Sequence, residues 1–133
     1  MVQRRYYRQI TIRYISFTPP KDDVDADIDY LYQCLGLGDE RDEVGRLVFP
    51  ALVKSGTAAI SSRDIMSLGE MSQAAVIYHL NLFQRSGLVV KDGRNYYLRG
   101  FTLSNALDEL ENDMHRRFEH LRGIARKIEG KEG

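Results

Sequence analysis

Apolar residues recur at helical intervals through much of the chain, which predicts a mainly helical fold. Four of them stand three or four residues apart near the start: Val24, Ile28, Leu31 and Leu35. This spacing behind an acidic start predicts a helix over residues 23–35. A second helix is predicted from about Asp39 to Lys54, with an apolar face made of Val44, Leu47, Val48, Ala51 and Leu52. We expect Pro50 to kink this helix or to end it early.

The first residues show a different pattern, in which apolar and polar side chains alternate. Ile10, Ile12 and Tyr14 alternate with polar neighbours inside the segment 5–17, which is rich in aromatic and β-branched residues. Alternation with a period of two predicts a strand with one buried face. Two consecutive prolines end it.

The middle of the chain begins with short elements. A very short strand is predicted at 59–60, and a short helix through Leu68 follows, with Ser61 or Ser62 as its cap. Ser61 and Asp64 are three residues apart, as in a capping box. We expect Ile65 and Leu68 to point into the core.

A longer helix and a hairpin complete this region. Ser72 is a good N-cap for a helix that Gly87 ends. The buried stripe of this helix is Val76, Leu80 and Phe83. Two strands are predicted at 88–91 and 95–98, with a turn at 92–93. A short helix, a tight turn, a second helix and a hairpin, in that order, predict a helix-turn-helix followed by a wing.

The last third of the chain predicts one long helix, from about Thr102 to Ile128. At 1.5 Å per residue it would be roughly 40 Å long, which is too long for so small a core to cover. Its apolar residues follow alternating steps of three and four, interrupted by Arg117, which favours packing against a partner helix. The expected dimer interface is Leu103, Leu107, Leu110, Met114, Phe118, Leu121, Ile124 and Ile128.

Together the elements predict an α+β fold that is mainly α with a small β-hairpin, a winged helix-turn-helix. We expect three parts in a chain of 133 residues. They are an N-terminal strand and helix arm over 1–38, a winged helix-turn-helix DNA-binding domain over 39–100, and a C-terminal dimerisation helix and tail over 101–133.

Charge is distributed unevenly along the chain, although 19 basic and 19 acidic residues cancel. Residues 1–21 carry basic residues and no acid, and residues 22–45 are strongly acidic. Basic residues again outnumber acidic ones over 46–99. A surface that faces DNA needs positive charge of this kind.

The single cysteine, Cys34, excludes an internal disulfide and fits a reducing cytoplasm. Because it ends an apolar stripe, we expect it to be a buried small hydrophobe. Neither a signal-peptide pattern nor an apolar run of membrane-spanning length is present, so we expect no membrane partner and a cytoplasmic location.

The segments 72–89 and 91–98 resemble the ArsR-like winged helix-turn-helix transcription regulators of bacteria and archaea. The resemblance is carried by the His79-Leu80 pair, the Gly87-Leu88-Val89 helix exit, and Gly93-Arg94 with Tyr96-Tyr97 in the hairpin. It implies a homodimer that places one recognition helix per subunit in successive major grooves of double-stranded DNA.

The metal-sensing branch of that family is not matched. Residues 65–69 lack its cysteines. Asp113 and His115 supply half of a second ligand pattern, but the later positions hold Arg126 and Glu129. An incomplete ligand set rarely holds a transition metal, so we expect neither a metal nor another cofactor.

Turning the buried stripe of the predicted recognition helix inward turns a polar set outward. The expected DNA-binding residues are Ser72, Gln73, Ala74, Tyr78, Asn81 and Arg85 on this helix, with Arg63, Lys91 and Arg94 beside it. Amide side chains can pair with adenine edges, and an alanine can contact a thymine methyl group. Cationic side chains contact phosphates, which fixes register without reading sequence.

A winged helix can also bind protein rather than DNA. The neutral net charge, the acidic segment 22–45 and a recognition helix with a single arginine favour that alternative. We do not expect an enzyme, because the sequence shows no nucleophile beside a partnered base and no glycine-rich phosphate loop. His79, at the edge of the buried stripe, is expected to be a packed structural histidine.

Overall fold

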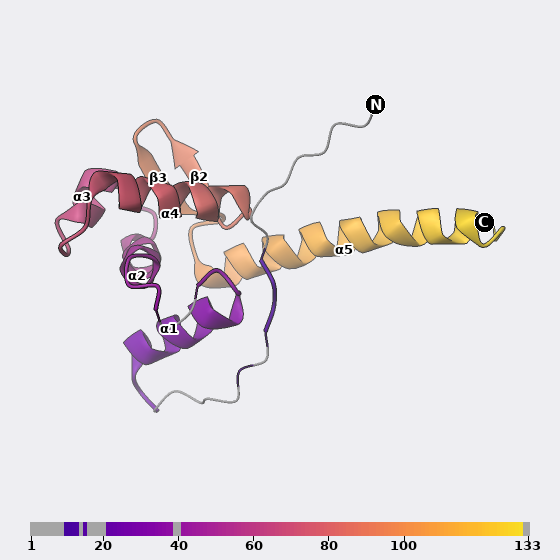
Figure 1. Cartoon of the computed structure of the whole chain (residues 1–133), viewed down its shortest axis with the longest axis horizontal. Helices are drawn as coiled ribbons and strands as arrows, with labels where there is room; N and C mark the ends of the chain where they lie inside the picture. The colour runs from indigo at the N-terminus through magenta and orange to yellow at the C-terminus, as the bar shows by residue number, and fades with distance from the viewer. Residues whose placement is uncertain (1–9, 14, 16–20, 39–40, 132–133) are drawn as a thin grey trace.

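The computed structural model describes residues 10–13, 15, 21–38 and 41–131. They form a mainly helical fold with one small antiparallel sheet, which confirms the α+β class (Figure 1). The elements are α1 (Val24–Cys34), α2 (Gly45–Ser55), β1 (Ile60–Ser61), α3 (Ser62–Met66), α4 (Gln73–Arg85), β2 (Val89–Asp92), β3 (Asn95–Leu98) and α5 (Leu103–Ile128). The helices predicted over 23–35, 72–86 and 102–128 are confirmed almost to the residue.

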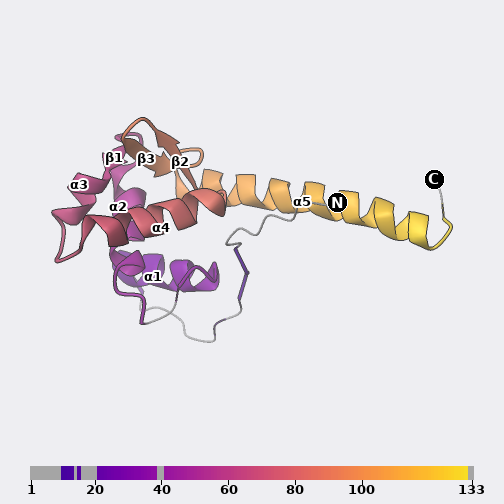
Figure 2. The same cartoon turned by 45° about the horizontal axis from the view of Figure 1, so that its top comes forward.

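The core lies where α1, α2, α4 and the sheet meet, at one end of the molecule (Figures 1 and 2). Three fully buried aromatic rings fill its centre. The ring centroids of Tyr32 and Phe49 lie 5.1 Å apart, and Phe83 packs edge-on against them at 5.8 and 6.3 Å. Each such pair contributes about 0.5–1.5 kcal/mol beyond the burial of its apolar area.

The second helix begins later than expected and continues past its proline. It spans Gly45–Ser55 rather than starting near Asp39, and the expectation that Pro50 ends it early is wrong. A proline inside a helix removes one backbone donor and costs about 3 kcal/mol. Phe49 and Leu52, on either side of Pro50, are fully buried. Their burial, at about 1.5–3 kcal/mol each, is enough to offset that cost.

The short helix α3 begins at the predicted capping box. Oγ of Ser61 accepts a hydrogen bond from the backbone N of Asp64, and Oδ2 of Asp64 accepts one from the backbone N of Ser61, both at 3.2 Å. Ile65 is fully buried, as predicted. The reciprocal bonds satisfy two backbone donors that a helix start otherwise leaves unpaired.

Two leucines expected in the core lie at the surface instead. Leu68 is 58% exposed and Leu47 is 45% exposed. The reason for Leu68 is that α3 ends at Met66, so Leu68 falls in the loop before α4 rather than on a helical face. Leu47 approaches this loop, with its Cδ1 3.4 Å from where a Cβ at Gly69 would lie.

The three strands are arranged in the order β1-β3-β2, and both pairings are antiparallel. Asp92 pairs with Asn95, so the two-residue turn of the hairpin is Gly93-Arg94, one residue later than predicted. Gly93 adopts a φ of +63°, a conformation that glycine accepts without steric cost and that two-residue hairpin turns require.

The strand predicted over 5–17 is absent from those of its residues that the structure describes. Residues 10–13 and 15 form no strand, and the remainder of the segment, Tyr14 included, lies outside the described residues. Ile10 is half-buried, but Ile12, expected on the same buried face, is 64% exposed. The alternation of the sequence therefore does not correspond to a buried face here.

The end of α1 supplies the backbone partners of this N-terminal segment. The backbone N of Thr11 donates to the carbonyl of Leu35 at 3.1 Å, and that of Arg13 to the carbonyl of Cys34 at 2.8 Å. These carbonyls are among those that a helix end leaves unpaired, so the segment takes the place of a cap rather than joining a sheet. Cys34 itself is half-buried rather than buried.

The long helix α5 extends away from the rest of the fold (Figures 1 and 2). Oγ1 of Thr102 caps it by accepting a hydrogen bond from the backbone N of Asn105 at 3.1 Å. Near this start Ala106 is buried, whereas every residue after Asp113 is exposed as far as Lys131. Among the described residues, no helix combines the length and the apolar character needed to cross a bilayer.

Candidate nucleic-acid interface

The orientation of α4 is set by its cap and its buried stripe. Oγ of Ser72 accepts a hydrogen bond from the backbone N of Ala75 at 3.1 Å, as expected for the predicted N-cap. Val76, Leu80 and Phe83 are fully buried, as predicted. Because these three residues share one face of the helix, the opposite face is turned to solvent.

The exposed face of α4 carries most of the side chains predicted to read bases. Exposed positions are Ser72, Gln73, Ala74, Tyr78 and Arg85, whereas Asn81 is half-buried. Tyr78 is 62% exposed, and its ring lies edge-on to the ring of His79 with centroids 5.2 Å apart. The outward orientation of these residues agrees with the prediction, and their contact with DNA stays a prediction.

A histidine–aspartate contact holds α4 against the segment before α2. Nε2 of His79 lies 3.0 Å from Oδ1 of Asp42, and Nδ1 lies 2.9 Å from the carbonyl oxygen of Ala75. The His79 and Asp42 side chains are 14% and 17% exposed. His79 is thus a packed structural histidine, as predicted. Its partner was not predicted. Oδ1 of Asp42 also accepts a hydrogen bond from the backbone N of Gly45, the first residue of α2, at 2.9 Å.

Four cationic side chains around α4 keep their charge unpaired within the described part of the chain. Arg63, Arg85, Lys91 and Arg94 are exposed, and none forms an ion pair with another described residue. The sequence from 71 to 91 contains no Asp or Glu. Cations without acidic partners remain available to an anion such as a DNA phosphate.

The hairpin of β2 and β3 lies beside α4 (Figure 2). Two of these cations, Lys91 and Arg94, belong to it and are exposed. Nζ of Lys91 lies 5.8 Å from the centroid of the Tyr96 ring. A cation–π contact at an exposed site contributes about 0.5–1 kcal/mol and leaves the ammonium charge in place. At the other end of the hairpin, Tyr97 stacks on Phe101 with centroids 4.7 Å apart.

Arg99, which follows β3, joins the sheet to α5. Its Nη1 lies 2.5 Å from Oδ2 of Asp113, and its Nη2 lies 3.0 Å from Oε2 of Glu109. The hydrogen bond from the Arg99 guanidinium lowers the pKa of Asp113 below its ordinary value and raises the pKa of Arg99. Arg116 also contacts Asp113. Among the described residues, no three His, Cys, Asp or Glu side chains cluster closely enough to hold a metal.

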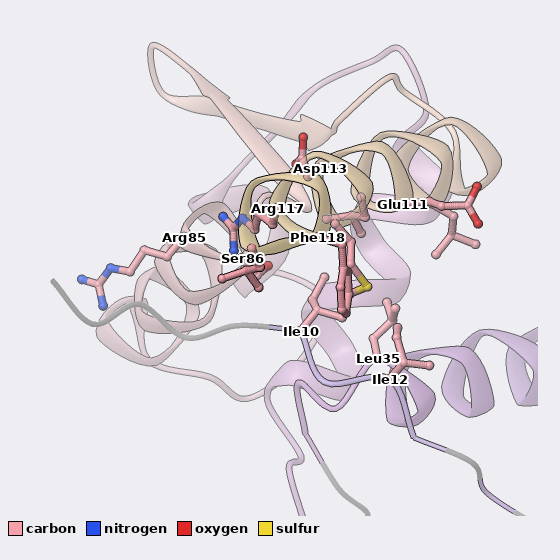
Figure 3. A pocket seen from close by; sticks show the side chains of 13 residues that line it. Ile10, Ile12, Leu35, Arg85, Ser86, Glu111, Asp113, Arg117 and Phe118 are labelled. Atoms are coloured by element: carbon pink, nitrogen blue, oxygen red, sulfur yellow. The ribbon is translucent and has the colours of Figure 1, made fainter. Parts of the chain in front are cut away.

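A groove of about 520 Å³ lies between α5, the end of α4, the end of α1 and the N-terminal segment (Figure 3). Ile10, Ile12 and Leu35 form one wall, and apolar residues of α5 form the other. In Figure 3, Phe118 points from α5 toward Ile10 and Leu35, and Arg85 points away from the groove. The groove is therefore largely apolar.

The candidate nucleic-acid interface therefore combines the exposed face of α4 with cationic side chains of α3 and the hairpin. Its residues lie between Arg63 and Arg94 in the sequence. Comparisons with protein-family models, with curated proteins and with solved structures find no match to this chain.

Proposed function

We propose that this protein is a dimeric, sequence-specific DNA-binding transcription regulator of the winged helix-turn-helix class. In this proposal α3 and α4 form the helix-turn-helix, and the hairpin of β2 and β3 is the wing. The recognition helix α4 enters the major groove of a pseudo-palindromic operator. The proposal depends most on one observation about α4. Its cap and its buried stripe fix the orientation of the helix, and its exposed outer face carries no acidic residue.

The exposed residues divide by chemistry into two groups. Gln73, the first residue of α4, and Tyr78, near its middle, can hydrogen-bond to base edges in the groove, and they provide sequence discrimination. The unpaired cations on α3 and the hairpin contact phosphates and position the helix. Asn81 is half-buried and reaches bases less readily than these two.

A dimer accounts for the exposed apolar residues of α5. Two subunits related by a two-fold axis present two recognition helices to half-sites about 10 bp apart, which is one turn of B-DNA. Each subunit then makes few contacts with DNA, and the affinity for the operator comes from both subunits binding together.

A protein-binding module is the second candidate, and one observation favours it. Leu47 and Leu68 are exposed close to the start of α4, where a DNA-binding surface has little use for apolar area. Exposed apolar residues next to a polar helix face are a common feature of protein-binding surfaces.

One titration separates the two candidates. A fluorescent duplex from upstream of the protein's own gene and a scrambled duplex of equal length are titrated at low and moderate salt. We expect preferential, salt-sensitive binding of the first duplex, and loss of that preference in the Gln73→Ala/Tyr78→Ala double variant. Gln84→Ala is the matched control, because Gln84 is exposed on α4 but lies outside the predicted contact set.

Equal, weak binding to both duplexes that the double variant leaves unchanged would contradict the DNA-binding proposal. In that case Leu47→Asp and Leu68→Asp test the protein-binding alternative, since both side chains are exposed and the substitutions should leave the fold intact.

A further inference from the structure

The apolar stripe of α5 is covered by its own subunit only near its start. Leu103, Leu107 and Leu110 are half-buried and pack on the core. The rest of the stripe is exposed to between 42% and 79%: Met114, Phe118, Leu121, Ile124 and Ile128. A helix face this apolar is costly to leave in water, so it needs a cover that the single chain does not provide among its described residues.

The groove beside α5 continues this stripe. Leu107, Leu110 and Leu121 belong to its α5 wall, and Ile10 and Leu35 belong to the opposite wall. A second helix that lies along the exposed stripe would therefore reach the apolar groove at the end of the stripe nearer the core. The groove favours a helix whose own end is apolar.

Charge along α5 is strongly polarised. Residues 103–113 contain Asp108, Glu109, Glu111 and Asp113 and no basic residue. Residues 114–128 contain Arg116, Arg117, Arg122, Arg126 and Lys127 against the single acid Glu119. Arg99 offsets part of the acidic half by pairing with Glu109 and Asp113. Asp108, Glu111, Arg126 and Lys127 are exposed and form no ion pair with another described residue.

We propose that α5 pairs with α5 of a second copy of this chain in the antiparallel orientation. The basic end of each helix then lies against the acidic start of the other, and Ile124 and Ile128 of each copy enter the groove of the other. This inference rests on the dimer of the proposed function and specifies its geometry. A parallel pair would place basic half against basic half, where like charges repel.

The stripe itself permits the reversal. Its steps of three and four residues are nearly symmetrical about Arg117, so that turning one helix around places apolar positions opposite apolar positions. Met114 then lies near the partner's Leu121, and Leu107 near the end of the partner's stripe. An isologous contact of this kind closes a dimer and leaves no surface for further growth.

Spin-label distances test the orientation. In a Cys34→Ser background, a label on Lys131→Cys marks the end of α5 and a label on Arg117→Cys marks its middle. For an antiparallel dimer we expect a separation on the order of 40 Å between the two labels at position 131, and less than about 20 Å at position 117. Short separations at both positions would indicate a parallel pair and overturn the inference.

Charge reversal tests whether the opposite charges of the two helix halves cause the antiparallel orientation. Arg126→Glu/Lys127→Glu should weaken the dimer about tenfold or more, because an acidic end then meets an acidic start. Asp108→Lys/Glu111→Lys should weaken it in the same way. Mixing the two variants restores opposite charges at both contacts, so the mixed dimer should form as tightly as the native one. Two variants that each dimerise as tightly as the native chain would contradict the antiparallel contact.

The outcomes also separate this inference from the proposed function. A dimer by sedimentation with a short separation at position 131 overturns the antiparallel geometry and leaves the dimeric regulator intact. A chain that stays monomeric overturns both the geometry and the dimer. If the native chain binds the two duplexes equally, the proposal of a sequence-specific regulator is overturned. That result leaves the spin-label distances, and so the dimer geometry, unaffected.

Discussion

The α-carbon of Gly45 lies so close to the hydroxyl of Tyr32 that a methyl group on Gly45 would overlap both this hydroxyl and the carboxylate of Asp42. The Tyr32 hydroxyl donates to Oδ2 of Asp42 at 2.6 Å, and the backbone N of Gly45 donates to Oδ1 at 2.9 Å. With the contact to His79, one carboxylate joins α1, α2 and α4. This junction fixes α4 relative to the other two helices.

Gly45→Ala should destabilise the protein, although alanine is the better helix former. In an open helix the change stabilises by about 0.5–1 kcal/mol. At Gly45 the methyl group displaces the Tyr32 hydroxyl from Asp42, and we expect a net loss of about 1–3 kcal/mol in the free energy of unfolding. Urea denaturation of the native chain and the variant measures it.

Gly123→Ala is the matched control. Gly123 lies within α5, and a Cβ there would meet nothing within 4 Å. The substitution should therefore stabilise by about 0.5–1 kcal/mol. Effects of the same sign at the two glycines would contradict the steric argument for Gly45.

Asp42→Ala should lower the free energy of unfolding more than Gly45→Ala does. It leaves the Tyr32 hydroxyl, the Gly45 backbone N and His79 without their acceptor, and unpaired buried donors cost about 1–3 kcal/mol each. Partial access of water reduces the sum, so we expect a loss of about 2–4 kcal/mol by chemical denaturation. Asp42→Asn keeps the size and one accepting oxygen and should lose less. A loss under about 0.5 kcal/mol for Asp42→Ala would show that the junction contributes little.

Elements whose stabilising contacts are local could be predicted from the sequence. The capping residue Ser72 and the stripe of Val76, Leu80 and Phe83 define α4 within one stretch of chain, and the structure confirms each of them. The same holds for the box formed by Ser61 and Asp64. The exposed residues of the candidate site follow from the helical period, once the buried stripe is known.

Features that depend on distant contacts could not be predicted in this way. Asp42 and His79 are 37 residues apart in the sequence, and nothing near Asp42 indicates its partner. Pro50 lies inside α2 because buried residues from other elements hold that helix together. Ile12 alternates like a strand residue, but the backbone around it finds its partners at the end of α1. Local pattern is outweighed by tertiary contacts at each of these positions.

Asp113→Asn should reduce stability at neutral pH and not in acid. The Arg99 hydrogen bond lowers the pKa of Asp113 in the folded protein below the value of about 3.9 that is usual for Asp. A depressed pKa stabilises the folded state above the unfolded value, and the stabilisation is lost as pH falls through the folded value. We expect a loss of roughly 1 kcal/mol between pH 5 and 7, shrinking below about pH 4, by thermal denaturation across pH.

Glu119→Gln is the control for this pH dependence. Glu119 pairs with Arg122 on the same exposed face of α5, at 2.6 Å between Oε1 and Nη1. Exposed pairs three residues apart contribute only a few tenths of a kcal/mol, so this variant should unfold like the native chain. A pH-independent difference for Asp113→Asn would mean that the substitution acts through packing rather than through the ion pair with Arg99.

In the proposed DNA complex, removing the hairpin cations should change the salt dependence of binding more than its sequence preference. Lys91 and Arg94 are exposed and have no acidic partner among the described residues, and each phosphate contact contributes about 0.9 to the slope of log K against log salt. Lys91→Ala/Arg94→Ala should therefore lower the slope by about 2 for each subunit bound and weaken operator and scrambled duplexes alike. Lys54→Ala is the control, because Lys54 pairs with Asp25 and lies outside the predicted DNA-binding set. An unchanged slope in the hairpin variant would contradict phosphate contacts by the hairpin.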